Sequence, residues 1–390
     1  MNSFNIYKIV AGLSVICLLI SAVCFYRGGI EQAGPFVIAF FITLAISFRG
    51  FTLLKGFSYT LTIFAAVTTA LYYPQYFIQI NGFTLAMLIT PLIQLIMFGM
   101  GTSMSIKDFA GVIKMPKGVF IGVFSHFLIM PALGFTLAKL SGFPPEIAAG
   151  IILIGCSPNG MASNVISYLA KANLALSITI TAVSTMLAPF FTPLLMKLLG
   201  GTFIKIDMLK MMWDITKMVI LPIGAGILFN KYLLKRAKWL EKVMPMVSMF
   251  GIAFIIVIIT AAGRSSLLNI GFMLVLLVLI HNLMGYTLGY WAGRLFKMDE
   301  RDCRTMAIEV GMQNGGLASG LAKEMGKVAT VGLAPAVFGP LMNITGSLLA
   351  NYWHRKPIIP SEKKGIPGSS GAGEYAIENT NPANFLDKEK

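Results

Sequence analysis

The stretch EVGMQNGGLASG, Glu309 to Gly320, places a carboxylate and two carboxamides inside a run that is otherwise apolar. Glu309 is the only acid deep within that run, and an ionisable residue at such depth in a membrane segment usually serves a function. Neighbouring apolar runs carry no Lys or Arg at comparable depth. The sequence therefore favours a small cation as the counter-charge, and the alternative is a structural carboxyl that burial keeps protonated.

A second polar segment repeats the first. GCSPNGMAS, from Gly155 to Ser163, aligns with GMQNGGLAS, from Gly311 to Ser319, at a constant offset of 311 − 155 = 156 residues. Both segments carry helix breakers, because Pro removes a backbone donor and Gly tolerates an unwound backbone. The breakers are Pro158, Asn159 and Gly160 in one segment and Gly311, Gly315 and Gly316 in the other. We expect two broken helices whose breaks meet, since unpaired backbone at membrane depth cannot face lipid.

Oxygen-bearing side chains near the first break could complete a cation site. A sodium ion takes about five or six hard oxygen ligands, by extension of the rules for calcium and magnesium. Ser163 and Asn164 follow the first break, and Ser177 and Thr181 lie one turn apart on one face of the next helix. The sequence predicts that these four residues converge with Glu309, although an isolated Ser or Thr more often bonds to its own helix backbone.

Helix termini at the two breaks would also suit an anion. The half-helices that begin after the breaks would point their N-terminal amides, with a partial positive charge, into the central cavity. This arrangement favours an anionic substrate.

Composition places the chain among polytopic membrane proteins. Of its 390 residues, 56% are hydrophobic and 12% are charged, and the mean hydropathy is +0.77. Apolar runs of about 20 residues, long enough to cross a bilayer, recur along it. Twelve crossings are predicted, at 6–26, 33–48, 59–78, 83–102, 118–140, 146–171, 173–199, 211–230, 243–262, 267–293, 304–323 and 329–352.

The crossings divide into predicted domains. Five crossings separate the two polar segments, and an odd number inverts their orientation, so the repeat units are antiparallel. We predict an all-α protein with two additional N-terminal helices in 1–56, a first five-helix repeat in 57–201, a second, inverted repeat in 202–356 and a disordered cytoplasmic tail in 357–390.

Basic residues predict the orientation. The formal charge of +15 comes from short loops between apolar runs, which the positive-inside rule explains better than a nucleic-acid partner does. Both termini are predicted to be cytoplasmic, in a plasma or inner membrane, with isolated charges such as Arg27, Lys205 and Arg264 outside. The loops on the cytoplasmic side would carry Arg49 and Lys55; Lys107, Lys114 and Lys117; Lys231, Lys235, Arg236, Lys238 and Lys242; and Arg294, Lys297, Arg301 and Arg304.

Cysteines indicate neither a disulfide framework nor a metal site, because the four are scattered without a CxxC pair. We expect small apolar packing residues and no organic cofactor. They are Cys17, Cys24, Cys156 and Cys303.

Several sequence motifs of the chain resemble those of the bile acid/sodium symporter family. The similarity covers about 59 to 353 and includes MFGMGTSMSIKDF, HFLIMP, GCSPNGMASNVISYLAKANLALSITITAVSTMLAPFFTP, KMVILPI, HNLMGYTLGYWAG, AIEVGMQNGGLA and ITGSLLANYW, in order. The resemblance implies a core domain and a flatter panel domain, with two broken helices crossing in the core. It also implies sodium as the coupling ion, and the bilayer and a small organic anion as partners.

Two sodium sites follow from the resemblance. The first would use Ser163, Asn164, Ser177, Thr181 and Glu309, and the second Glu309, the carbonyls of Val310 and Met312, the side chain of Gln313 and a glutamine in the third repeat helix. That glutamine is His126 here. A histidine nitrogen is a poor sodium ligand, because hard cations prefer oxygen. The second site is thus weakened, altered or replaced by proton coupling.

The resemblance also implies a substrate region. Asn314 matches the position nearest the substrate, and the backbone of Asn159, Gly160 and Met161 lies beside it. The family's GGT is NGM here, and a histidine of bile-acid-binding relatives is Met342, before Asn343. Both departures argue against bile acid itself and leave bile-acid-like, pantoate-like or other carboxylates and sulfonates as candidates.

Sodium-coupled import of a small organic anion by alternating access is the leading hypothesis. A proton-coupled transporter that uses His126 and Glu309 is the alternative, followed by a passive channel or sensor. An intramembrane hydrolase built from Ser163, His126 and Glu309 lacks a GxSxG-like nucleophile setting. The sequence leaves the anion and the oligomeric state open, and a monomer fits.

Overall fold

The computed structural model describes residues 3–51, 57–105, 108, 111–233 and 239–356. Nine helices in these ranges are long and apolar enough to cross a membrane, so the protein is an all-α polytopic membrane protein. The predicted tail, 357–390, and the basic residues Lys55, Lys107, Lys235, Arg236 and Lys238 lie outside the described residues.

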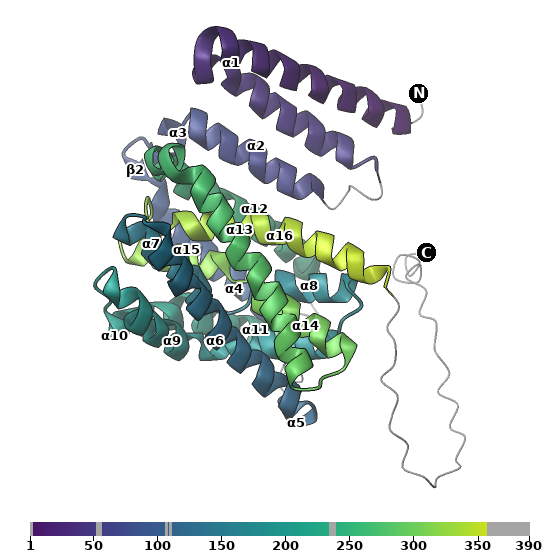
Figure 1. Ribbon diagram of the computed structural model, residues 1–390, viewed down its shortest axis with the longest axis vertical. Helices are drawn as coiled ribbons and strands as arrows, with labels where there is room; N and C mark the ends of the chain where they lie inside the picture. The colour runs from purple at the N-terminus through teal and green to yellow at the C-terminus, as the bar shows by residue number, and fades with distance from the viewer. Residues whose placement is uncertain (1–2, 52–56, 106–107, 109–110, 234–238, 357–390) are drawn as a thin grey trace. The chain divides into compact units, whose positions relative to one another are not determined.

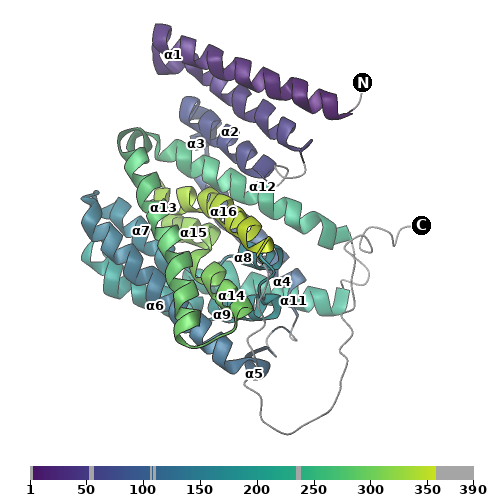
Figure 2. The same ribbon diagram turned by 45° about the vertical axis from the view of Figure 1, so that its right-hand side comes forward.

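The helices and strands follow one another in the order shown in Figures 1 and 2. They are α1 (Ser3–Phe48), α2 (Ser58–Tyr72), α3 (Gln75–Ile78), β1 (Gln79–Ile80), β2 (Phe83–Thr84), a 3-10 helix (Leu85–Leu88), α4 (Ile89–Ser103), α5 (Gly111–Lys114), α6 (Pro116–Ser141), α7 (Pro145–Cys156), α8 (Ala162–Leu169), α9 (Leu174–Leu199), a 3-10 helix (Gly200–Thr202), α10 (Met208–Ile215), a π-helix (Thr216–Ile220), α11 (Leu221–Leu233), α12 (Trp239–Ala262), α13 (Arg264–Leu295), α14 (Glu300–Gly311), α15 (Gly315–Glu324) and α16 (Leu333–His354).

Two predicted N-terminal crossings form the single element α1. The chain reverses at Gly29, whose φ of 77° is left-handed, and the two halves of α1 run side by side in Figure 1. Helix α1 packs on α2. The predicted third crossing, 59–78, is wrong in its second part, since α2 already ends at Tyr72 and a two-stranded hairpin follows. Asn81 and Gly82 both have positive φ and form its two-residue turn, which is the conformation that an Asn-Gly pair favours.

The remaining helices pack in two groups. Helix α4 packs along α11 and α12, and α2 lies against α12. In the second group α13 packs along α14, α6 along α7, and α16 against α13 and α7. Helices α7 and α14 are buried along most of their length, and each leads into a short second helix, α8 or α15. The second group therefore holds both polar segments of the sequence.

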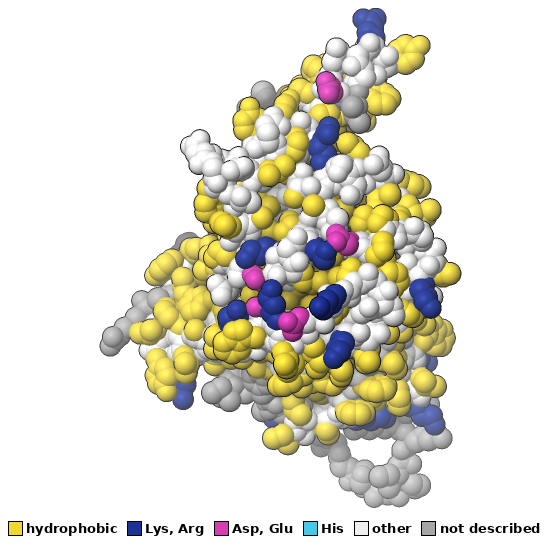
Figure 3. Space-filling model, turned by 90° about the vertical axis from the view of Figure 1, so that its left-hand side faces the viewer, with side chains coloured by type: hydrophobic (Ala, Val, Ile, Leu, Met, Phe, Trp, Pro, Cys, Tyr) yellow, Lys and Arg dark blue, Asp and Glu magenta, His cyan; other side chains and the backbone are white. Residues whose placement is uncertain are grey.

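One end of the helix bundle carries charged side chains in its middle. Figure 3 shows lysines and arginines mixed with acids there, bordered by hydrophobic side chains. Lys205, predicted as an isolated charge on the external side, lines one pocket of about 180 Å³ together with Lys210 and Lys327. Asp207, Asp214 and Glu324 line the same pocket and offset these charges.

Arg304 was predicted in a loop and is instead buried, at 2% exposure, within α14. Its Nε donates to Glu300 Oε1 at 2.9 Å, and its Nη1 donates to the carbonyls of Ala170 at 3.3 Å and Trp353 at 3.2 Å. These carbonyls lie at the ends of α8 and α16, where helical donors run out, and the Trp353 carbonyl also accepts from Lys356 N at 3.0 Å. The guanidinium thus joins three helix ends, which makes its burial favourable.

Arg304→Ala should lower the stability of the protein by about 3 to 5 kcal/mol, because it takes the ion-pair partner from Glu300, the guanidinium donor from the buried Ala170 carbonyl and one of the donors from the Trp353 carbonyl. The melting temperature of the purified protein in detergent measures this change. Arg301→Ala, at an exposed position in the same helix, is the control and should melt near the wild type. Equal melting of both variants would contradict the structural role of Arg304.

Candidate functional site

Both polar segments are interrupted helices. Helix α7 ends at Cys156 and α8 begins at Ala162, so Pro158, Asn159 and Gly160 lie in a non-helical segment as predicted. The second interruption is shorter than predicted. Helix α14 ends at Gly311 and α15 begins at Gly315, which leaves only Met312–Asn314 outside the helices. Gly315 and Gly316 were predicted in the break and instead form the first turn of α15.

The two breaks pair with each other as an antiparallel bridge between Asn159 and Gln313. Asn314 N donates to Pro158 O at 2.8 Å, and Gly160 N donates to Met312 O at 3.4 Å. Backbone groups that the helices leave unpaired thereby find partners inside the protein. Pro158 and Asn314 are separated by 314 − 158 = 156 residues, the offset of the repeat, so equivalent positions of the two segments bond to each other.

A glycine is needed at position 160 because the backbone of the second break packs directly against it. A Cβ atom built on Gly160 would lie 2.8 Å from Gln313 O, a backbone atom that cannot rotate away. Gly160→Ala should separate the two breaks and lower the melting temperature of the purified protein. Gly201→Ala, where an added Cβ meets no atom within 4 Å, is the control. A Gly160 variant that melts like the wild type would contradict the close crossing.

Glu309 lies in the last turn of α14, fully buried, and accepts two hydroxyl hydrogen bonds from α9. Ser177 Oγ donates to Oε1 at 2.5 Å and Thr181 Oγ1 donates to Oε2 at 2.9 Å. Within the described chain no Lys or Arg pairs with this carboxylate. The carboxylate therefore lies buried with hydroxyl donors and without a cationic side chain.

Oxygen atoms crowd around the Ser177 hydroxyl. It lies 2.9 Å from Asn164 Oδ1 and 3.0 Å from Ser167 Oγ, in addition to its contact with Glu309. Thr181 Oγ1 is also 3.4 Å from Asn164 Oδ1 and 3.3 Å from Ser163 Oγ. One hydroxyl hydrogen cannot serve several acceptors at once. The structure thus brings the five residues of the predicted first site together, and their hard oxygens match the ligand preference of a small cation.

His126 lies at the crossing, fully buried on α6. Its Nδ1 is 3.2 Å from Glu309 O and its Nε2 is 2.9 Å from Ser157 O. The ring therefore bridges the second broken helix and the end of the first. The amide of Asn159 also donates to Glu309 O. Both contacts use the backbone carbonyl of Glu309 and leave its carboxylate to the α9 hydroxyls.

Two oxygens at the crossing lack a hydrogen-bond partner among the described residues although both are buried. They are Asn159 Oδ1 and Gln313 Oε1. The other end of the Gln313 side chain, Nε2, donates to Val310 O at 2.8 Å. Met312 O accepts from Gly160 N, so this carbonyl of the predicted second site is already bonded. Unpartnered buried acceptors are costly, and a cation or a donor at this point would offset that cost.

The predicted substrate residues are only partly brought together. Asn314 caps α15, since its Oδ1 accepts from Leu317 N at 3.0 Å, and it lies beside the first break. Met161, 36% exposed, follows Gly160 at the start of α8. Asn343 differs, because its amide donates to Gly339 O of its own helix at 2.9 Å and no hydrogen bond joins it to either break.

Several residues of the site were not predicted. Ser167 on α8 contacts Ser177, and Asn282 on α13 donates to Gly311 O at 2.9 Å, at the edge of the second break. Thr345 on α16 donates to Asn282 Oδ1 at 2.6 Å, and Tyr286 donates to Met342 O. The repeat offset could have drawn attention to Asn282, because 282 − 126 = 156 makes it the equivalent of His126.

Transition-metal ligands do not gather anywhere in the described ranges, where no three His, Cys, Asp or Glu residues form a group that could hold a metal ion. All four cysteines are free. The oxygens around Glu309 are instead of the type that hard cations prefer.

Comparisons with known proteins agree with this arrangement. Residues 90–270 match the profile of the Sodium Bile acid symporter family. The "Uncharacterized sodium-dependent transporter YocS" of Bacillus subtilis (strain 168) is 38% identical over 285 residues, which cover 73% of this chain and 87% of that protein. The chain belongs to the sodium bile acid symporter family. The resemblance inferred from the sequence motifs is thereby confirmed.

Plant members of the sodium bile acid symporter family are also similar. The "Probable sodium/metabolite cotransporter BASS1, chloroplastic" of Arabidopsis thaliana is 36% identical over 259 residues, covering 66% of this chain and 65% of that protein. The BASS1 protein of Oryza sativa subsp. japonica is 34% identical over 281 residues, covering 70% and 68%. Membership of this family indicates a membrane transporter of a small molecule rather than an enzyme, with sodium as the coupling ion.

Proposed function

We propose that the protein imports a small organic anion together with sodium by alternating access. The observation that carries the proposal is the buried Glu309 carboxylate, whose oxygen neighbours come from both sides of the crossing and whose surroundings in the described chain hold no Lys or Arg partner. A sodium ion bound by Ser163, Asn164, Ser177, Thr181 and Glu309 would neutralise this charge. The names of the relatives, sodium-dependent transporter and sodium/metabolite cotransporter, support the same choice of ion.

Sodium would couple to the substrate through the two breaks. Asn164 is in α8, directly after the first break, and Glu309 is in α14, three residues before the second. An ion held by both fixes the relative position of α8 and α14, and therefore the shape of the paired segment between Pro158 and Asn314. A ligand can shift such an equilibrium only by its differential affinity for the two states. Ligands drawn from two movable helices supply that difference.

The substrate would bind at the start of the two half-helices, α8 and α15. Helix α15 begins with Gly315 and its first amides are capped by Asn314. Helix N-termini carry a partial positive charge that suits a carboxylate or sulfonate. We assign Asn314 and the backbone of Asn159, Gly160 and Met161 to this region. The exposed Met161 side chain offers an apolar contact for an organic body.

We also propose the orientation and the domain division. Both termini would be cytoplasmic in a plasma or inner membrane, with inverted five-helix repeats in 57–201 and 202–356 behind the additional α1 helices. The group of α6, α7, α9, α13, α14 and α16 would form the core that moves against the group of α2, α4, α11 and α12.

Uptake into proteoliposomes tests the proposal. A thermal-shift screen of the purified protein against organic anions, with and without sodium, first selects a substrate. Uptake of that anion should then be concentrative under an inward sodium gradient and lost without sodium. Each net charge moved across 100 mV contributes roughly 2.3 kcal/mol. An interior-negative potential should therefore increase accumulation if the sodium ions carry more positive charge inward than the anion carries negative charge. Uptake that only equilibrates the anion would indicate a channel or sensor.

A proton-coupled transporter is the second candidate because both ring nitrogens of His126 face carbonyl oxygens. Only a doubly protonated imidazole donates to both acceptors. A pH gradient without sodium should drive uptake in this case. Failure of the pH gradient, with uptake under a sodium gradient in the same vesicles, would exclude proton coupling.

A further inference from the structure

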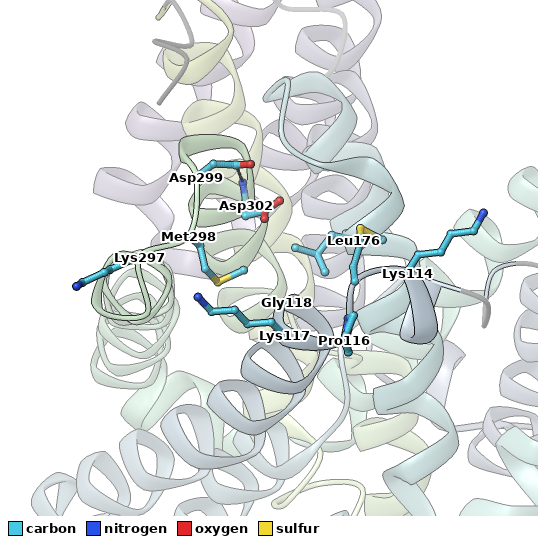
Figure 4. Close-up of a pocket in the computed structure, with 10 residues that line it drawn as sticks. Lys114, Pro116, Lys117, Gly118, Leu176, Lys297, Met298, Asp299 and Asp302 are labelled. Carbon is cyan, nitrogen blue, oxygen red and sulfur yellow. Dashed lines mark hydrogen bonds between the residues drawn. The ribbon is translucent and has the colours of Figure 1, made fainter. Parts of the chain in front are cut away.

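A pocket of about 370 Å³ lies between the α5–α6 turn, the start of α9 and the connection from α13 to α14. Figure 4 shows Leu176 and Met298 near its middle and Asp299 and Asp302 at one side, with the Lys114 and Lys297 side chains extended outward at opposite edges. Lys114 and Lys297 therefore lie at the rim and Lys117 extends beside Met298, whereas one carboxylate, that of Asp302, begins a line of polar groups that leads inward.

That line follows one face of α14. Asp302, Thr305 and Glu309 are spaced by three and four residues, which places them on the same face of a helix. At 1.5 Å per residue, Asp302 and Glu309 are separated by about 10 Å along the helix axis. Thr305 lies between them, fully buried. The face therefore connects the pocket with the buried carboxylate.

Helix α9 presents a matching line. Asn173, Ser177 and Thr181 follow one another at intervals of four residues. The two lines are joined at both ends: Asn173 Nδ2 donates to Asp302 Oδ1 at 2.8 Å, and Ser177 donates to Glu309. Midway, Asn173 N donates to Thr305 Oγ1 at 2.9 Å. We call these six residues the polar seam.

Apolar side chains close the seam toward the pocket. Leu176 lines the pocket, is 1% exposed and precedes Ser177 in the chain. It belongs to a small cluster with Val119, Ile121, Ile180 and Met306 that is separate from the main core, with Met298 packed against it. A Cβ on Gly118 would lie 3.0 Å from Leu176 Cδ1. The absence of a side chain at Gly118 therefore leaves room for the Leu176 side chain. Leu176 thus lines the pocket, and the next residue, Ser177, bonds to Glu309.

We propose that the polar seam is the route by which the coupling sodium ion passes between the Glu309 cluster and this pocket, with Leu176 as its gate. The inference rests on the proposed function and adds an exit for the ion that is separate from the substrate region at Asn314. Asp302 lies at the pocket end of the route and draws the cation toward it. The seam oxygens replace water along the way, as hard ligands for a small cation.

Sodium exchange across proteoliposomes tests the route without any organic substrate. Radioactive sodium is placed inside, with equal unlabelled sodium on both sides, and its loss is followed in time. Leu176→Ala should speed the exchange about tenfold, a factor that corresponds to a barrier lower by roughly 1.4 kcal/mol. Asp302→Asn keeps the size of the side chain and an oxygen for Asn173, and should slow exchange about twofold, as expected for one charge at about 10 Å in a watery medium.

Leu333→Ala is the matched control, since it removes the same atoms from a fully buried position in α16 outside the seam. Sodium-dependent thermal shifts of all variants report whether the binding site persists. A normal shift with exchange no faster in the Leu176 variant than in the Leu333 variant, or with no change on Asp302→Asn, would overturn the route and leave the proposed function standing. A wild-type protein whose melting does not respond to sodium would overturn both.

Discussion

Glu309→Gln should abolish sodium-dependent uptake while the protein remains folded. The substitution keeps the shape of the side chain and one oxygen for the hydroxyls of Ser177 and Thr181, and removes only the charge. Removing one partner of a buried charge interaction costs about 3 to 5 kcal/mol, or roughly a hundredfold or more in sodium affinity. Asn164→Ala, which removes a neutral oxygen ligand of the same cluster, should weaken sodium binding in the same direction.

The measurement is initial uptake into proteoliposomes as a function of sodium, together with the sodium-dependent thermal shift of the purified protein. Glu146→Gln is the matched control, since Glu146 is another acid on a broken helix, in the first turn of α7, where it bonds to Lys327 and Thr330 away from the crossing. The control should transport normally. Sodium-dependent transport that survives in both Glu309→Gln and Asn164→Ala would rule out this cluster as the ion site.

Local sequence predicts the helices of this protein well, because an apolar run of sufficient length has few alternatives in a bilayer. It predicts their ends less well. The third predicted crossing extended through Pro74 and stopped at Ile78, yet α2 ends at Tyr72 and the Asn81–Gly82 turn forms a hairpin. Pro74 was visible in the sequence, but hydropathy alone carried the predicted crossing through it, whereas Asn81 and Gly82 were left outside both neighbouring crossings. Arg304 was placed in a loop for the same reason, and two acceptors distant in sequence, the carbonyls of Ala170 and Trp353, together with Glu300 in the same helix explain its burial.

The position of the second break shows what local sequence lacks. Gly315 and Gly316 are the weaker helix formers, but the residues that leave the helix are Met312–Asn314. The reason is the bridge to Asn159, about 150 residues away, which pairs Gln313 and Asn314 with the first break. Helix propensity contains no information on such a distant partner. The repeat offset did contain this information, since Pro158 and Asn314 are equivalent positions of the two segments.

The preference of cations for oxygen ligands predicted the ion cluster from residue types. It could not distinguish the Ser and Thr residues that belong to the cluster from those that do not. Ser184 and Thr185, on the same helix as Thr181, bond only to the Thr181 carbonyl, as most membrane hydroxyls do. Ser167 looks the same in sequence and contacts Ser177 instead. Only the packing of α8 against α9 distinguishes these cases.

His126→Gln should increase the number of sodium ions that act together. The imidazole of His126 lies between the carbonyls of Glu309 and Ser157, and nitrogen is a poor ligand for a hard cation. Glutamine would place an oxygen in this space, and Gln313 Oε1 of the second predicted site is buried without a partner among the described residues. The sodium dependence of uptake should become more sigmoidal, with a Hill coefficient that rises from about 1 toward the number of sites.

His281→Gln separates this effect from the loss of any buried histidine. His281 is equally buried and bonds to Met130 O at 3.0 Å, and among the described residues no hydrogen bond joins its side chain to either break. Its replacement should lower stability and leave the shape of the sodium curve unchanged. A hyperbolic curve in His126→Gln, with normal folding, would mean that the space beside Glu309 does not accept a second ion. If a pH gradient drives uptake in the wild type and no longer does so in His126→Gln, the imidazole carries the coupling proton instead, because the carboxylate of Glu309 is present in both proteins.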